Sequence, residues 1–99
     1  MKGKFCVVRC RDAGVHAGVV KEVNGNSVLL EESRRLWYWR VPMGASSFLS
    51  GVATAGLDAG SSKVGGPITV LLTEACEVIE CTPAAEASIR ACPVHVRTA

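Results

Sequence analysis

Apolar and polar residues alternate along the first third of the chain, as they do in strands that bury one face. Residues 5–10 and 15–23 predict two such strands. The Asn-Gly-Asn sequence at 24–26 predicts a hairpin turn, because Asn and Gly tolerate the positive φ of a tight turn. Residues 27–31 and 34–40 then predict a third and a fourth strand.

Beyond residue 40 the pattern changes to short helical periods separated by further strands. Two serines precede apolar residues at helical spacing, which predicts a helix over residues 46–54 with Ser46 and Ser47 at its N-terminal cap. Residues 55–67 are rich in Gly and Ser and predict a flexible loop. The remaining predicted elements are strands at 68–72, 75–81 and 93–97 and a helix at 83–91, which has Pro at its first turn.

These elements predict one α+β domain over residues 1–99, built on a small, mainly antiparallel sheet or partial β-barrel with two short helices. A chain of 99 residues has the size of one domain. Its five aromatic residues, two Trp, two Phe and one Tyr, leave small side chains to fill most of the core. Small domains with thin cores commonly gain stability by association, so we expect a homo-oligomer.

The positive charge of the chain is local. Residues 1–40 carry eight basic and four acidic residues, a net charge of +4, whereas residues 41–99 carry three basic and five acidic residues, a net charge of −2. The total of +2 is too small for a surface that binds long nucleic acid. No apolar stretch has the length of a membrane-spanning helix, so we expect no membrane partner.

The five cysteines predict reduced thiols. Their odd number and the absence of a signal peptide favour a cytoplasmic protein. Cys6 and Cys10 lie about 13 Å apart if both belong to one strand, too far to share a metal ion. We therefore expect buried thiols that act as small hydrophobic residues, with no metal site and no cofactor.

The stretch SRRLWYWR, residues 33–40, holds three of the five aromatic residues and three of the eleven basic residues. If it is a strand, each of its faces mixes rings with guanidinium groups, which a pure core strand would not do. Cations hold phosphates and flat rings stack on bases, so this composition predicts a nucleotide-binding site. The alternative is that one tryptophan anchors the core and the arginines are merely solvated. The predicted ligand-binding residues are Arg9, Arg11, His16, Arg34, Arg35, Trp37, Tyr38 and Trp39.

Catalysis has little support in the sequence, and we predict no catalytic residues. His16 and His95 invite comparison with phosphodiesterases that use two histidines, each two residues before Ser or Thr, but Gly18 and Arg97 occupy those positions here. No pair of acidic residues has a spacing that assigns acid and base roles. Among the cysteines only Cys10, between two arginines, has the electropositive setting of a nucleophile.

Several motifs together are distinctive. They are Arg9, Ala13-Gly14-Val15-His16, Gly18, Arg34-Arg35, Trp37-Tyr38-Trp39 and Leu72-Thr73-Glu74-Ala75. With these motifs the chain resembles, over about residues 6 to 90, a family of small uncharacterised proteins encoded by tailed phages and prophages. The resemblance implies a viral accessory protein in the cytoplasm of an infected bacterium, and it brings no assigned activity.

By analogy of class, other small phage proteins act as sponges that sequester the nucleotide signals of bacterial immunity, such as cyclic oligonucleotides and cyclic ADP-ribose isomers. Our leading hypothesis is therefore a phage-encoded anti-defence protein that binds such a nucleotide without cleaving it. Two alternatives remain open at this point. One is a protein-interaction module that inhibits a host enzyme through SRRLWYWR, since Trp, Tyr and Arg dominate interface energies. The other is an accessory protein of virion assembly.

Overall fold

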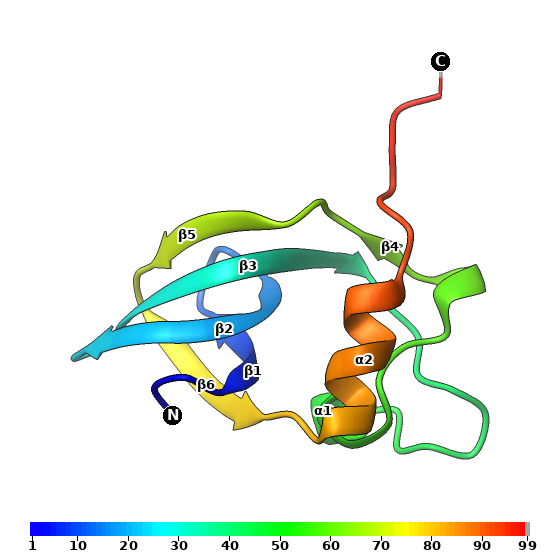
Figure 1. The fold of residues 1–99 in the computed structure, drawn as a ribbon, viewed down its shortest axis with the longest axis horizontal. Coiled ribbons are helices and arrows are strands. Elements are labelled where there is room, and N and C mark those ends of the chain that lie inside the picture. Colours follow the sequence, from blue (N-terminus) through cyan, green and yellow to red (C-terminus); the bar gives the residue numbers. More distant parts are fainter. Residues whose placement is uncertain (99) are drawn as a thin grey trace.

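The N-terminal part of the chain folds into three consecutive antiparallel strands, β1 (Phe5–Cys10), β2 (Val15–Asn24) and β3 (Ser27–Tyr38) (Figure 1). The computed structural model describes residues 1–98. The hairpin predicted at Asn-Gly-Asn is confirmed, because β2 and β3 meet there and Gly25 has a φ of +60°. β1 and β2 are joined by a short turn that ends at Gly14, with a φ of +82°.

The rest of the chain adds two helices and three strands to this meander. The sheet has the order β4-β3-β2-β1-β6, β5 pairs with β3 off this path, and every strand pair is antiparallel. The predicted α+β fold is confirmed, in the form of an open sheet with two short helices. The added elements are α1 (Leu49–Ala55), a 3₁₀ turn η1 (Ala59–Ser61), β4 (Lys63–Val64), β5 (Ile68–Leu72), β6 (Ala75–Glu80) and α2 (Pro83–Ala91).

β3 is one long strand, so the prediction of separate third and fourth strands is wrong. The backbone is irregular at Glu32, which has a φ of +53°, but the strand continues through this residue. The register with β5 shifts between Leu30 and Ser33. The first half of β3 therefore pairs with β5 and the second half with β4, since an extra residue bends a strand and redirects the residues beyond it.

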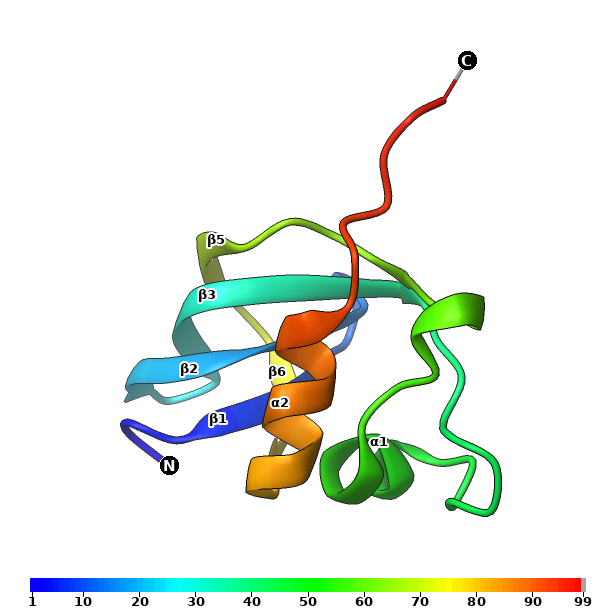
Figure 2. The same ribbon diagram turned by 45° about the vertical axis from the view of Figure 1, so that its right-hand side comes forward.

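Both faces of the sheet are buried around β1. On one face, Val7 belongs to a core that α1 and α2 cover, and Figures 1 and 2 show these helices together on that side. On the other face, Val8 belongs to a second core with Leu30 and Leu72. This double burial explains why β1 reads as an almost continuous apolar run. Most members of both cores are Val, Ala, Leu or Cys, as the shortage of aromatic residues predicts.

Three details near the helices differ from prediction. α1 begins at Leu49 after Phe48, whose side chain makes no capping bond, and Ser46 Oγ instead accepts a hydrogen bond from the Phe48 N–H at 3.4 Å. Residues 93–97 form no strand, because the tail meets only the two-residue β4, through an isolated bridge between Val64 and Val94. β6 ends at Glu80, one residue before the predicted end.

The helix predicted at 83–91 is confirmed as α2, where Thr82 caps the N-terminus by accepting a hydrogen bond from the Ala85 N–H at 3.1 Å. The Gly- and Ser-rich segment 55–67 contains η1, β4 and the buried Leu57. Within residues 1–98, no helix combines the length and the apolar character that crossing a membrane requires.

Gly18 lies where β2 and β3 come close together, and we expect Gly18→Ala to destabilise the fold. A Cβ at this position would lie 2.8 Å from Ser33 Cα and 2.9 Å from the Glu31 carbonyl oxygen, so the backbone must shift. Overpacking of this kind costs about 1–3 kcal/mol in the free energy of unfolding, measurable by urea denaturation. Gly60→Ala is the control, because its Cβ would meet nothing closer than Asp58 Oδ1 at 3.9 Å. Equal stability of the two variants would contradict the expectation.

Candidate functional site

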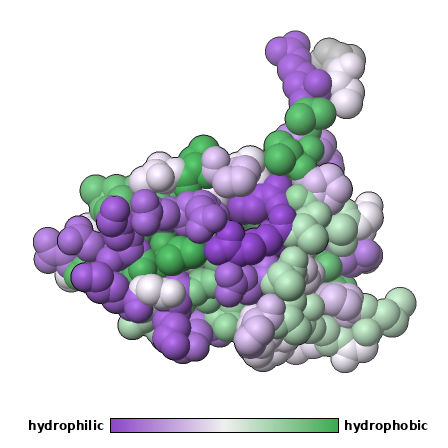
Figure 3. Space-filling model, in the orientation of Figure 1, coloured by the Kyte–Doolittle hydropathy of each residue, from purple (hydrophilic) through white to green (hydrophobic). Residues whose placement is uncertain are grey.

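The second half of β3 carries one side of a cleft on the outer surface of the sheet. Trp37 is 69% exposed there, beside β4 and the C-terminal tail. Figure 3 shows apolar residues at the base of that tail next to a band of hydrophilic residues. This hollow of about 200 Å³, which we call the Trp37 cleft, is lined by Arg35, Trp37, Lys63, Val64, Gly65 and His95.

The Trp37 cleft is cationic and aromatic. Lys63 Nζ lies 5.2 Å from the centre of the Trp37 ring, within the range of a cation–π interaction. The His95 ring lies 5.9 Å from the Trp37 ring at an interplanar angle of 41°. No acidic side chain lines the cleft. An anion is therefore the complementary ligand, and one with a flat ring can also stack on Trp37.

Backbone hydrogen bonds hold the walls of the cleft together. The Gly65 N–H donates to the Arg35 carbonyl at 2.8 Å, and the His95 N–H donates to the Val64 carbonyl at 2.9 Å. Three segments that are distant in sequence, namely β3, β4 and the tail, thus meet at one place. Their backbones are held together before any ligand arrives, which lowers the entropy cost of binding.

Arg35 provides an unpaired cation at the cleft. Within residues 1–98, no carboxylate lies within ion-pair distance of Arg35 or Lys63. The Arg35 guanidinium extends toward the turn that precedes β2, since a Cβ built on Gly14 would lie 3.6 Å from Arg35 Nη2. An exposed, unpaired guanidinium is suited to a phosphate because its planar fork can donate two parallel hydrogen bonds.

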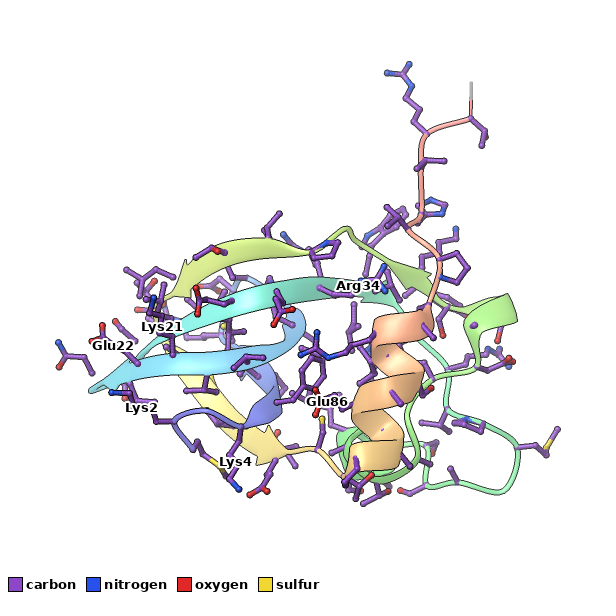
Figure 4. All side chains as sticks on the ribbon, viewed as in Figure 1. Lys2, Lys4, Lys21, Glu22, Arg34 and Glu86 are labelled. Carbon is purple, nitrogen blue, oxygen red and sulfur yellow. The ribbon has the colours of Figure 1, made fainter. Side chains whose placement is uncertain are left out.

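Arg34 points to the opposite face and is only 3% exposed. Its Nε donates to the Gly65 carbonyl at 2.8 Å, and its Nη1 donates to the carbonyls of Ile89 at 3.0 Å and Cys92 at 2.5 Å. Figure 4 places its side chain beside the C-terminal end of α2, where the helix dipole is negative. The structure therefore gives Arg34 an architectural role, and the predicted phosphate contact is wrong because its guanidinium is covered.

Two other predicted cations lie in ion pairs along the β1–β6 side of the molecule. Arg9 Nε lies 3.2 Å from Glu77 Oε1. Arg11 Nε lies 3.3 Å from Asp12 Oδ2 and 3.5 Å from Glu74 Oε2. Neither residue lines the Trp37 cleft, and their charge is balanced where they are.

His16 lies beside Arg35 across the β2–β3 ladder, but its ring is buried. Nε2 lies 2.9 Å from the Ala13 carbonyl oxygen and donates to it, since a carbonyl can only accept. Burial lowers the pKa of His16, and the nearby Arg35 adds to this effect against the hydrogen bond to Ala13. A neutral, covered imidazole is a poor phosphate ligand, so His16 supports the sheet instead.

The three rings of the aromatic stretch separate in the structure. Tyr38 is exposed, and its hydroxyl oxygen accepts a hydrogen bond from Arg40 Nε at 3.1 Å. Trp39 is partly buried against the helix-covered core and faces a different hollow, of about 420 Å³, near Phe48. Because β3 ends at Tyr38, the strand alternation that would align Trp39 with Trp37 stops. Trp39 is thus the core ring and Trp37 the surface ring.

Sequence reasoning missed Lys63 and placed His95 only in a catalytic comparison. Lys63 lies within the Gly- and Ser-rich segment, and nothing in its neighbourhood marked it as part of a site. His95 reaches the cleft only because the tail bridges to β4. No three His, Cys, Asp or Glu side chains gather in the described part of the chain in a way that could hold a metal ion.

The fold and the cleft define a small α+β protein whose open sheet carries a cationic and aromatic cleft. The chain belongs to a family described as a domain of unknown function (DUF6948), whose model matches residues 3–89. We found no match among curated proteins or among solved structures. Of the side chains that line the cleft, His95 lies beyond the matched residues.

The five cysteines differ in exposure, and we expect Cys76 to be the fast-reacting thiol. Cys6, Cys10 and Cys92 are buried, and burial raises the pKa of each. Burial also raises the pKa of Cys81 to about 12. A raised pKa keeps these thiols protonated at pH 8 and slow toward Ellman's reagent, whereas exposed Cys76 reacts.

The kinetics of thiol labelling at pH 8 check this expectation. Cys76→Ser should remove the fast phase and leave the slow phase unchanged. Denatured protein is the control, because every thiol should then react fast. A fast phase that survives Cys76→Ser would contradict the assignment.

We expect Arg34→Met to lower the free energy of unfolding by about 3 kcal/mol or more, because it leaves buried carbonyls without a donor. Arg35→Met is a matched control in the next position. The Arg35 guanidinium is exposed and makes no ion pair within residues 1–98. The free energy of unfolding of this variant should therefore stay within about 0.5 kcal/mol of the wild-type value. Chemical denaturation of both variants measures the difference, and similar values for the two would refute the architectural role of Arg34.

Proposed function

We propose that the protein binds a phosphate-bearing nucleotide in the Trp37 cleft and holds it without cleaving it. The observation that carries this proposal is the meeting of an unpaired Arg35, Lys63 and an exposed Trp37 in a hollow that no acidic side chain lines. The cations would bind the phosphates of the nucleotide, and the Trp37 ring would stack on its base.

The exposed tryptophan supports the assignment of a base to this cleft. A side chain as large and apolar as Trp is usually buried, so its exposure at a hollow indicates a contact made with another molecule. Stacking of a base on an aromatic side chain contributes about 1–3 kcal/mol. Lys63 now lies over the Trp37 ring, and a stacked base would displace it toward the phosphates.

The lining of the cleft favours retention of the ligand over its cleavage. General acid–base hydrolysis of a phosphodiester uses two groups that exchange protons. Among the lining residues His95 and Lys63 have side chains of the kind that exchange protons, and no carboxylate or thiol accompanies them. A cationic site without a carboxylate favours binding of the anion over cleavage of its bonds.

In its specific form, the proposal is that the protein is a phage-encoded anti-defence sponge in the cytoplasm of the infected bacterium. Its ligand would be a nucleotide immune signal, either a cyclic oligonucleotide or a cyclic ADP-ribose isomer. The resemblance to phage and prophage proteins and the composition of the cleft both support this form. A homo-oligomeric sponge would carry one cleft per chain.

A second candidate is a protein-interaction module that inhibits a host enzyme. Besides Trp37, the exposed side chains of Tyr38, Met43 and Phe48 favour it, because large apolar and aromatic residues on a surface are typical of protein contacts. Stable capture of one host protein, without any stabilisation by nucleotides, would distinguish this function from the first.

Thermal-shift measurements against cyclic di- and trinucleotides and ADP-ribose isomers test the proposal. We expect one class of nucleotide to raise the melting temperature and to return unchanged, by mass spectrometry, after the protein is denatured. Recovery of a cleaved product would show that the protein is an enzyme and not a sponge. No shift across the panel would overturn nucleotide binding.

We expect Trp37→Ala and Arg35→Ala each to weaken the affinity for the stabilising nucleotide about 10-fold or more, as measured by calorimetry. The reason is loss of the stacking surface in one variant and of the free guanidinium in the other. Lys21→Ala removes a positive charge at the far end of the sheet, where Lys21 pairs with Glu31, and should bind like the wild type (Figure 4). Full affinity in both cleft variants would show that the nucleotide binds outside the Trp37 cleft.

A further inference from the structure

Three strands of the open sheet, β4, β5 and β6, each pair with one neighbouring strand. The tail covers the outer side of β4 through the bridge between Val64 and Val94, which leaves β5 and β6 to consider. Within residues 1–98, β5 pairs only with β3, and β6 pairs only with β1. Figures 1 and 2 show β5 at the rim of the sheet, with no further element beyond it. The outer N–H and C=O groups of such a strand are a template on which another strand can pair.

The two edges differ in their side chains. β6 contains Glu77 and Glu80, which form ion pairs with Arg9 and Lys4, and charged side chains are a common protection of a sheet edge. β5 has the sequence Ile-Thr-Val-Leu-Leu, with no charge and no proline inside it. β5 is therefore the unprotected edge.

Two side chains of β5 lie in water although they are large and apolar. Ile68 is 55% exposed and Leu71 is 59% exposed. Apolar side chains in water have an unfavourable hydration free energy, and the backbone groups beside them are free to pair with another strand. The thin core gives the single chain little stability to offset that cost.

We infer that β5 is the docking edge for a second copy of this chain. The two copies of β5 pair antiparallel across a two-fold axis at Val70, and the two sheets become continuous. Ile68 of one copy then lies opposite Leu72 of the other, and Thr69 lies opposite Leu71, so apolar residues meet apolar or neutral residues throughout.

The lack of charge permits a second copy and disfavours a charged partner at this edge. In a two-fold contact each surface meets itself, so any charge on the edge would face a like charge. The β5 edge avoids that repulsion because it is neutral from Ile68 to Leu72. An edge built for a charged partner would carry the opposite charge, and β5 carries none.

The dimer also has a consequence for the layout of the Trp37 cleft. Ser33 pairs with Ile68, and Arg35 follows two residues later on the same strand. Each cleft therefore lies beyond one end of the joined edge, and the dimer presents two clefts on one continuous sheet. This inference concerns the assembly and stands independently of which ligand the cleft binds.

A contact between two five-residue strands is small compared with the standard interface of about 1,600 Å². We therefore expect a dissociation constant in the micromolar range, and the mass should depend on protein concentration. Sedimentation equilibrium of the full chain, from about 5 to 200 µM, measures it. The expected result is twice the mass of the chain at the upper end of that range.

Leu71→Lys and Ile68→Lys place a charge on the edge at exposed positions and should each weaken dimerisation at least 10-fold. Val23→Lys is the matched control, because Val23 is 53% exposed but lies on β2. Melting temperatures within a few degrees of the wild type would show that the variants are folded.

Three results would overturn the inference. They are a wild-type protein that stays monomeric at the highest concentration, a dimer that both edge variants leave intact, and a dimer that Val23→Lys disrupts equally. Amide hydrogen exchange provides a second readout without mutation. Residues 68–72 should gain protection as protein concentration rises, and unchanged exchange in a sample that does dimerise would place the contact elsewhere.

Discussion

The buried guanidinium of Arg34 is the interaction on which the arrangement of this molecule depends. Within residues 1–98 it has no carboxylate partner. Its Nε and Nη1 donate instead to the main-chain carbonyls of Gly65, Ile89 and Cys92, while its buried Nη2 has no hydrogen-bond partner among the described residues. A buried cation is tolerable in this position because the C-terminal end of α2 presents negative partial charge. One side chain on β3 thereby ties together the segment after β4, the last turn of α2 and the start of the tail. Two of these segments, the one after β4 and the tail, line the Trp37 cleft.

The inward direction of Arg34 also determines which of the next side chains are exposed. Side chains alternate along a strand, so burial of Arg34 and Leu36 turns Arg35 and Trp37 to the surface. The tail that leaves α2 is held close enough to place His95 against Trp37, and β4 brings Lys63 to the same ring. The buried Arg34 and the Trp37 cleft thus lie on opposite faces of one strand.

Small side chains shape the rest of the protein. The cores on the two sides of β1 consist mostly of Val, Ala, Leu and Cys, which each bury little area. The chain compensates with main-chain hydrogen bonds and with burial on both faces of its central strands. It also leaves an uncharged edge at β5, where association with a second copy would extend the sheet. The acidic residues of β6 keep that edge hydrated, so the edges at β5 and β6 differ in charge.

Local chemistry determined much of this protein before any long-range contact. The alternation of apolar and polar residues predicted β1 and β2, and Asn and Gly predicted the hairpin that follows them. Helix α2 begins where Thr82 and Pro83 predicted its start. The aromatic and basic stretch also contains two of the residues that line the cleft, Arg35 and Trp37. Alternation separates two faces of a strand but does not say which face is buried, so only the tertiary structure decided that Arg34 is covered. It likewise decided that Lys63 and His95 belong to the cleft, because strand pairing and a helix end, not neighbouring residues, bring them there.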